Sequence, residues 1–258
     1  MGEPGAWDPG KLCGIEDGEL HVLSFGALGT SGASGTAGAF GEMSGTSGVP
    51  GPADERRWAA RGGARMCGDG TEDGTRSLLA DVLGRPRDEI ALGRDGHGRL
   101  RVDGLSAGLY VCRDDGALAV AIAPGAEVAL SGHPVPPALE GAALLPYTDA
   151  ERRMADTVPR HRRSWFLTRL WVRKEAALRL ASPGRLSLAA QVDALGRRNG
   201  EVLVPEPLPG GGHCPRRAYV VDLSDGDRGR VAAAATSVPM GSVRVWRARA
   251  RLASCVTG

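Results

Sequence analysis

The chain has 258 residues, of which 42% are hydrophobic and 24% charged, enough for one large domain or two small ones with a core. A net charge of +2 excludes the strongly basic balance of typical nucleic-acid-binding proteins. The five cysteines are widely spread without a Cys-x-x-Cys pair, which argues against a zinc knuckle or a disulfide framework and favours a reducing cytoplasm.

The first predicted elements frame a long glycine-rich stretch. Residues 1–18 are expected to be a poorly ordered leader without the apolar core of a secretory signal, and residues 19–25 alternate like a strand. Residues 26–52 are rich in Gly, Ser, Thr and Ala and are interpreted as a flexible loop. A phosphate-cradling loop is the alternative, although the Gly-x-x-x-x-Gly-Lys-(Ser/Thr) motif is missing.

The rest of the first half combines helices with short strands. A helix is expected to start within residues 52–57, and a second helix over residues 75–83 is ended by Gly84 and Pro86. Strands are predicted at residues 100–102, 108–112, 117–123 and 127–130, the middle two forming a hairpin across an Asp-Gly turn.

The second half shows clear local signals. Thr148 with Glu151 three residues later forms a capping box at the start of a helix, and a long helix follows over residues 162–181. A hairpin and a last strand are predicted at residues 218–223, 230–235 and 242–249. We therefore predict an α+β fold of two similar halves, residues 19–130 and 131–249, followed by a tail at 250–258.

The long helix carries charges close to its apolar face. Its apolar arc comprises Leu167, Leu170, Trp171, Leu178 and Ala181. Lys174 falls inside this arc, Glu175 lies at its edge, and Arg179 follows one turn later. Buried charges need partners, and an i, i+4 pair between Glu175 and Arg179 is the simplest interpretation. The remaining arginines of the helix are expected to be solvated on its outer face: Arg163, Arg169 and Arg173.

The pattern Trp171-x-x-Lys174-Glu175-Ala176-x-x-Arg179 resembles the signature of the surfactin-type 4'-phosphopantetheinyl transferases. The resemblance covers most of the chain from Leu20 to about Arg249. It implies two similar α+β halves with the active site between them. It also implies transfer of phosphopantetheine from coenzyme A to a carrier-protein serine with magnesium, in polyketide or peptide natural-product biosynthesis.

The resemblance also assigns roles to individual residues. Glu175 would hold magnesium, with Ser131 as a weak second ligand, and coenzyme A would contact Arg76, Arg99, Ser106, Lys174 and Arg179. The other motifs are altered. Ser131 and His133 stand where the family has Asp and Glu, so one of three magnesium carboxylates is kept, and Ala107 replaces the histidine after Ser106.

These substitutions suggest a different chemistry. If the fold is kept, His133 and Glu175 lie within hydrogen-bonding reach, and a Glu-oriented histidine is a general base near neutral pH. His133 could instead be a solvated residue before a proline-rich loop. The stretch from Gly104 to Gly108 spells Gly-x-Ser-x-Gly around Ser106, but a hairpin follows where a nucleophile elbow needs a helix.

Three hypotheses remain open at this stage. The chain is a transferase in which Glu175 holds the metal, a metal-independent enzyme on a carrier- or coenzyme A-bound intermediate with a His133–Glu175 base, or a non-catalytic carrier-protein binder. Over these hypotheses the candidate catalytic residues are Glu175, Lys174, His133 and Ser106. We expect a cytoplasmic monomer that binds neither nucleic acid nor membrane.

The remaining histidines are expected on surfaces or turns: His21, His97, His161 and His213. The aromatic residues of the long helix are expected between the two halves, with a docking role possible for Trp165: Trp165, Phe166 and Trp171.

Overall fold

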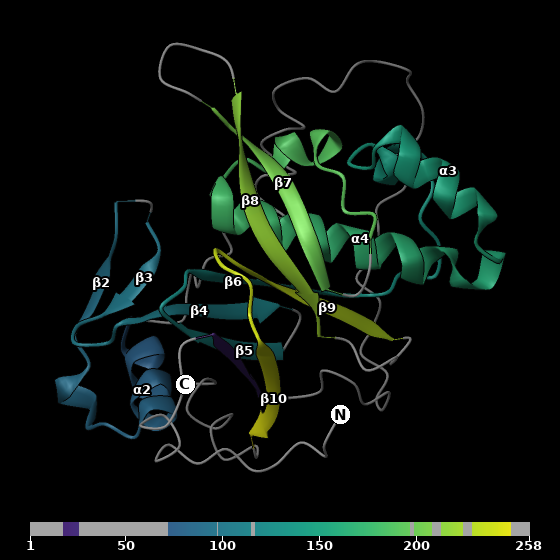
Figure 1. Ribbon diagram of the computed structural model, residues 1–258. Helices are drawn as coiled ribbons and strands as arrows, with labels where there is room; N and C mark the ends of the chain where they lie inside the picture. The colour runs from purple at the N-terminus through teal and green to yellow at the C-terminus, as the bar shows by residue number, and fades with distance from the viewer. Residues whose placement is uncertain are drawn as a thin grey trace.

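The structure is a computed structural model that describes residues 18–25, 72–96, 98–114, 117–196, 199–207, 213–223 and 229–248. Residues 1–17 of the predicted leader lie outside the described residues, as do the glycine-rich loop, the first helix start, the tail and His97. Within the described ranges the protein is α+β, with several mainly antiparallel sheets and few helices (Figure 1). The expected fold class is therefore confirmed at this level.

The first sheet has four strands in the order β10-β1-β5-β4. Its strands are β1 (Glu19–Phe25), β4 (Ala107–Asp114), β5 (Ala117–Pro124) and β10 (Ser242–Ala248). Strand β1 is antiparallel to β5 but parallel to β10, with Glu19 opposite Ser242 and Phe25 opposite Ala248. The last strand of the chain thus completes the sheet that the first strand begins.

The second sheet has four antiparallel strands in the order β6-β9-β8-β7. They are β6 (Val128–Pro134), β7 (Asn199–Pro207), β8 (His213–Asp222) and β9 (Arg230–Thr236), and a two-stranded sheet pairs β2 (Leu92–Arg94) with β3 (Leu100–Val102). The predicted boundary after residue 130 falls inside β6.

Helices lie outside the two large sheets. The α-helices are α2 (Glu72–Leu83), α3 (Asp149–Thr157) and α4 (Arg160–Ala181), and the short 3-10 helices are η2 (Arg87–Glu89), η3 (Gly141–Leu144) and η4 (Leu186–Gln191). Thr148 caps α3 through the predicted capping box with Glu151. None of the described helices is long and apolar enough to cross a membrane.

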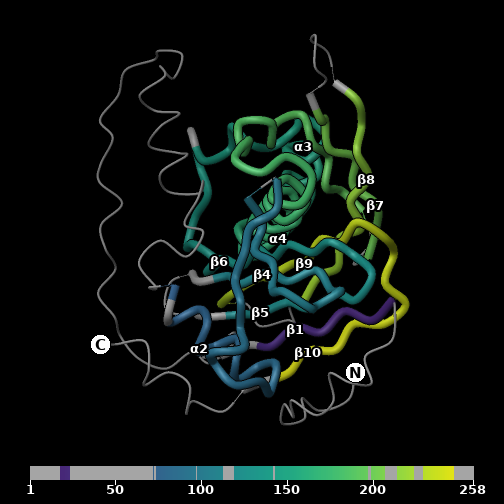
Figure 2. The backbone as a smooth tube through the Cα atoms, turned by 90° about the vertical axis from the view of Figure 1, so that its left-hand side faces the viewer, coloured from purple at the N-terminus to yellow at the C-terminus, as the bar shows by residue number. Residues whose placement is uncertain are grey.

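The alternation of apolar residues in the strands produces a stack of helix, sheet, sheet and helix, which is visible from the side in Figure 2. In β5, Val120 and Ile122 face α2, whereas Ala121 and Ala123 face the second sheet. In β6, Leu130 faces the first sheet, whereas Ala129 faces α4. Because strand side chains alternate, Ser131 follows Ala129 toward α4.

Strands β4 and β6 approach closely where the two sheets meet. A Cβ atom on Gly108 would overlap the carbonyl oxygen of Ala126, which lies in the turn between β5 and β6. The backbone of Gly125 in the same turn donates to the carbonyl oxygen of Ser106 at 3.4 Å. A side chain at Gly108 would therefore push β4 away from the start of β6.

Two expectations about polar residues are wrong. His21 is buried on β1, where Trp246 of β10 donates to its Nδ1 atom at 3.1 Å. Arg173 is buried as well, because Asp222 at the end of β8 accepts a hydrogen bond from it at 2.8 Å. His161 is exposed on α4, as expected.

Candidate functional site

The carboxylate of Glu175 is the centre of a polar cluster between α4 and β6. Glu175 is buried, and His133 Nε2 lies 2.6 Å from its Oε2 atom. Ser131 donates its hydroxyl hydrogen to the same oxygen. Arg179 Nη2 donates to the other oxygen, Oε1, at 2.9 Å. The predicted reach between His133 and Glu175 is confirmed, and so is the pair between Glu175 and Arg179.

The regular spacing of side chains along β6 and α4 explains why these residues meet. Positions 131 and 133 share one face of β6, and they face the α4 side of the sheet. Positions 171, 175 and 179 are spaced by four and share one stripe of α4. Trp171 accordingly stands beside His133, with ring centroids 6.5 Å apart and planes tilted by 46°.

Arg179 also links α4 to the backbone of β6, the edge strand of the second sheet. Strand β6 is the outermost strand of its sheet, so the carbonyls on its outer edge need partners from elsewhere. Arg179 Nη1 donates to the carbonyl oxygen of Leu130 at 2.7 Å. The guanidinium therefore joins the backbone of β6 to the carboxylate of Glu175.

The surroundings keep Glu175 ionised. Burial alone would raise the pKa of Glu175, but the hydrogen bond with His133, the charge of Arg179 and the hydrogen bond from Ser131 lower it below its ordinary value. An ionised carboxylate only accepts hydrogen bonds, so His133 Nε2 carries a hydrogen. The nitrogen of His133 that can take up a proton is then Nδ1, and the side chain is 27% exposed.

Magnesium does not fit this arrangement. It prefers several hard oxygen ligands in octahedral geometry, whereas both oxygens of Glu175 already accept hydrogen bonds and Arg179 places a positive charge 2.9 Å away. Across the described ranges, no group of three or more His, Cys, Asp or Glu side chains is arranged to hold a metal ion. This cluster as it stands therefore offers no site for magnesium.

Lys174 lies outside this cluster. Its Nζ atom is 2.5 Å from Glu151 Oε2 and donates to the carbonyl oxygens of Pro146 at 2.7 Å and Ala189 at 2.9 Å. The Tyr147 ring lies below the ammonium, 5.5 Å away. The three oxygen partners account for all three hydrogens of the ammonium group. They also join α4 to the segments around α3 and η4.

The other candidate ligands of coenzyme A lie in separate contacts. Arg76 pairs with Glu72 on the outer side of α2 at 2.8 Å. Arg99 pairs with Asp95 at 2.8 Å and with Glu127. Glu127 precedes Ser131 by four residues, which is roughly 13 Å along an extended strand. Ser106 is exposed immediately before β4. The structure therefore brings together Ser131, His133, Glu175 and Arg179.

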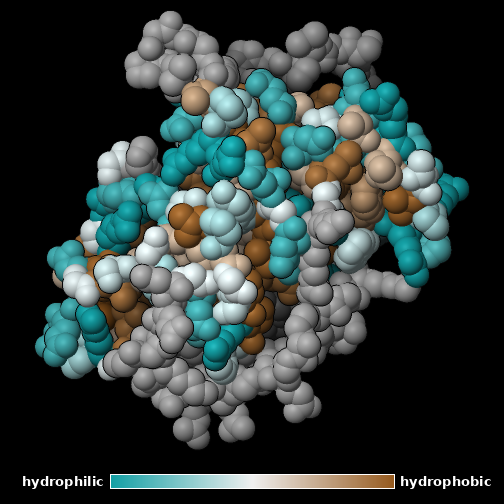
Figure 3. Space-filling view, viewed as in Figure 1, coloured by the Kyte–Doolittle hydropathy of each residue, from teal (hydrophilic) through white to brown (hydrophobic). Residues whose placement is uncertain are grey.

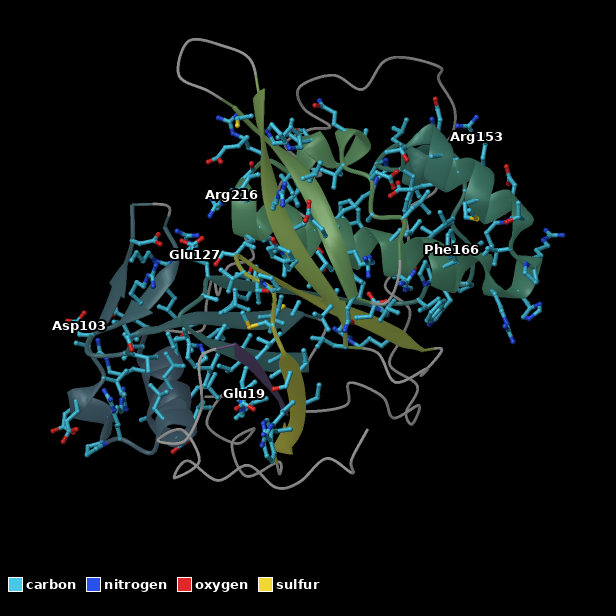
Figure 4. The ribbon with its side chains drawn as sticks, viewed as in Figure 1. Glu19, Asp103, Glu127, Arg153, Phe166 and Arg216 are labelled. Carbon is cyan, nitrogen blue, oxygen red and sulfur yellow. The ribbon has the colours of Figure 1, made fainter. Side chains whose placement is uncertain are left out.

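Sequence reasoning missed a second ionic junction around Glu127. Arg216 of β8 donates to Glu127 Oε2 at 2.7 Å, and Arg99 pairs with the same oxygen. Figure 4 shows Glu127 and Arg216 near one another where β8 passes the hairpin of β2 and β3. The sequence carries no signal for this junction, because its members are far apart along the chain.

The aromatic residues of α4 pack within the second half of the chain. Trp165 and Trp171 are partly buried against the core between α4 and the second sheet. Phe166 packs against the cluster formed by α3 and α4. The expected location between the two halves is therefore wrong, because α4 covers the face of the second sheet that points away from the first.

Comparisons with known proteins add no assignment. No protein-family model matches the chain. A search of curated proteins finds no significantly similar sequence.

Proposed function

We propose that the chain is a divergent relative of the 4'-phosphopantetheinyl transferases with two similar halves. The shared strand order of the large sheets supports this. In one sheet β1 pairs with β5 and β5 with β4, and in the other β6 pairs with β9 and β9 with β8. In both groups of three strands, the strand that comes first along the chain pairs with the one that comes last. Helix α2 covers the outer face of the first sheet, and α4 covers the outer face of the second.

We propose that this site performs metal-independent acid–base chemistry on a coenzyme A-bound or carrier-bound thioester. The observation that carries the proposal is the 2.6 Å contact between His133 and the buried carboxylate of Glu175. Glu175 orients the ring and stabilises the imidazolium that forms when Nδ1 accepts a proton. A positioned base of this kind contributes about 10²- to 10⁴-fold in rate.

Transfer of phosphopantetheine to a carrier-protein serine is the second candidate. The retained Trp171-x-x-Lys174-Glu175-Ala176-x-x-Arg179 pattern favours it. In this reaction the serine oxygen forms a bond to the β-phosphorus of coenzyme A, and adenosine 3',5'-bisphosphate leaves. Arg179 is the cation nearest Glu175 that could meet a phosphate, provided that it exchanges its present partners. A non-catalytic carrier-protein binder would show neither reaction.

Hydrogen exchange at the α-carbon of acyl-coenzyme A thioesters in D₂O with a chelator tests the first candidate. We expect exchange by the unmodified protein and a loss of about 100-fold or more in His133→Ala, because the base is removed. His161→Ala is the matched control, since His161 is an exposed histidine on α4 and makes no contact with Glu175, and it should retain full exchange.

The same preparations separate the candidates. Retention of exchange in His133→Ala would exclude His133 as the base. A mass increase of apo carrier protein by one phosphopantetheine group, with coenzyme A and magnesium, would instead support the transferase. Binding of carrier protein without either reaction would support the binder.

A further inference from the structure

The junction of α3 and α4 presents a cluster of exposed cations around one apolar side chain. We define the α3–α4 corner as Arg153, Met154, Arg160, His161 and Arg162, all of which are exposed. Met154 has 46% of its surface exposed. Figure 3 shows apolar surface over α3 and α4 bordered by hydrophilic side chains, and Figure 4 shows Arg153 extending from α3.

The arginines of the corner are weakly compensated within the described part of the protein, where only the charge of Arg153 acts on a nearby carboxylate, Asp149, whose pKa it helps to lower. The side chains of Arg153, Arg160 and Arg162 form no ion pair and no hydrogen bond with a described residue. Their neighbours differ, since Arg152 pairs with Asp149 and Arg163 lies 3.6 Å from Asp156. The corner therefore presents three exposed guanidinium groups that donate no hydrogen bond to any described residue.

The position of these cations is unfavourable for the folded chain. Helix α4 starts with Arg160, His161, Arg162 and Arg163, and its first turn contains no acidic residue. The N-terminus of a helix carries a partial positive charge that repels cations. Its N-cap, Pro159, provides no side-chain hydrogen bond. Cations that weaken the helix and form no ion pair with a described residue point to a partner outside the chain.

Positive charge is concentrated here rather than spread over the molecule. Residues 149–163 contain five arginines but only two exposed acidic residues, both aspartates. The third acidic residue, Glu151, is buried beside Lys174. The net charge of the whole chain is only +2. A local field of this kind steers an oppositely charged partner to one face.

We propose that the α3–α4 corner docks an acidic protein surface. Its carboxylates would pair with Arg153, Arg160 and Arg162, and an apolar side chain would cover Met154, whose flexible thioether adapts to protein contacts. Nucleic-acid binding would call for a larger positive balance than +2. This inference is independent of the chemistry proposed at Glu175, because it rests only on the surface of two helices.

Fluorescence anisotropy with a labelled acidic helical peptide tests the proposal. The peptide carries glutamates along one face and leucines spaced by four residues, and the full chain is titrated against it at low salt. Arg160→Gln/Arg162→Gln should weaken binding by about fivefold. The matched control is Arg85→Gln/Arg185→Gln, which removes the same charge from exposed arginines elsewhere and should leave binding unchanged.

Further measurements make the result decisive. Met154→Gln should also weaken binding, and with less dependence on salt, because it removes an apolar contact. The thermal midpoint of Arg160→Gln/Arg162→Gln should be unchanged or higher, since the helix loses repelled cations. Equal weakening by both double variants, absence of binding, or stronger competition by a DNA duplex or by phosphatidylserine vesicles would each overturn the proposal.

Discussion

At the residue scale, two adjacent charges on α4 have opposite surroundings. Lys174 reaches Glu151 and two backbone carbonyls, whereas Glu175 reaches His133, Ser131 and Arg179. Consecutive helical residues are separated by about 100°, so the two side chains leave the helix in different directions. Both are fully buried, and each is compensated by its own set of partners.

The role of Lys174 can be tested by removing its charge. Lys174→Met should lower the free energy of unfolding by about 3 kcal/mol, because Glu151 would remain buried without its cation. Glu151→Gln/Lys174→Met should recover part of this loss, and urea denaturation measures both. Glu72→Gln, which breaks the exposed pair with Arg76, should change stability by less than about 1 kcal/mol. A loss of activity in Lys174→Met without loss of stability would contradict the structural role.

At the element scale, the side chains of β1 and β10 reinforce the pairing of the two strands. Trp246 donates to His21 Nδ1, and His21 Nε2 lies 3.3 Å from Glu19. Glu19 also accepts hydrogen bonds from Ser242 and Arg244 of β10. A protonated His21 would present an N–H group to the N–H group of Trp246. The strand pair therefore favours the neutral imidazole.

This contact predicts that stability depends on pH. Burial lowers the pKa of His21 below its ordinary value of 6.5, and the hydrogen bond with Glu19 offsets this only in part. Below pH 6.5 His21 is protonated in the unfolded chain but still neutral in the folded chain. The free energy of unfolding should therefore fall as the pH decreases through that value. Thermal midpoints between about pH 8 and pH 5.5 measure the effect.

Two variants isolate the contribution of His21. His21→Gln should flatten the pH dependence over this range, whereas His161→Gln, at an exposed position, should leave it unchanged. An unaltered pH dependence in His21→Gln would assign the effect to another group.

At the scale of the whole molecule, Glu127 links elements from different parts of the chain. It pairs with Arg99 beside the hairpin of β2 and β3 and with Arg216 of β8, and its backbone donates to Ser237 Oγ at 2.9 Å. Strand β10 adds a second connection, because the chain passes from β9 of the second sheet to β10, which pairs with β1 of the first. The two sheets are therefore joined by ionic contacts as well as by their shared apolar layer.

Removing the charge of Glu127 should loosen one element selectively. Glu127→Gln should lower the free energy of unfolding by about 1 kcal/mol, because both arginines are partly exposed. Hydrogen exchange should accelerate in β2 and β3 and stay unchanged in α4. Glu201→Gln, which breaks an exposed pair with Arg217, is the control and should leave the exchange pattern unchanged. Uniform acceleration over the whole chain would contradict the local link.

Local patterns predicted the elements whose signals lie within a short stretch. The capping box at Thr148 placed α3, alternation placed β1, and the Asp-Gly turn placed β4 and β5. Strand β7 was not predicted, since Pro205 and Pro207 interrupt its strand pattern and are tolerated because it is the edge strand of its sheet.

Local sequence patterns are sufficient to show that α4 is a helix with charges on its apolar side and that Glu175 needs partners. The identity of those partners follows from the packing of β6 against α4. Ser131 and His133 lie 44 and 42 residues from Glu175, and the register of β6 brings them to α4. The burial of Arg173 by Asp222 and of His21 by Trp246 was decided in the same way. Helical and strand periods report which face of an element is apolar, whereas sheet order and register determine which distant side chain meets it.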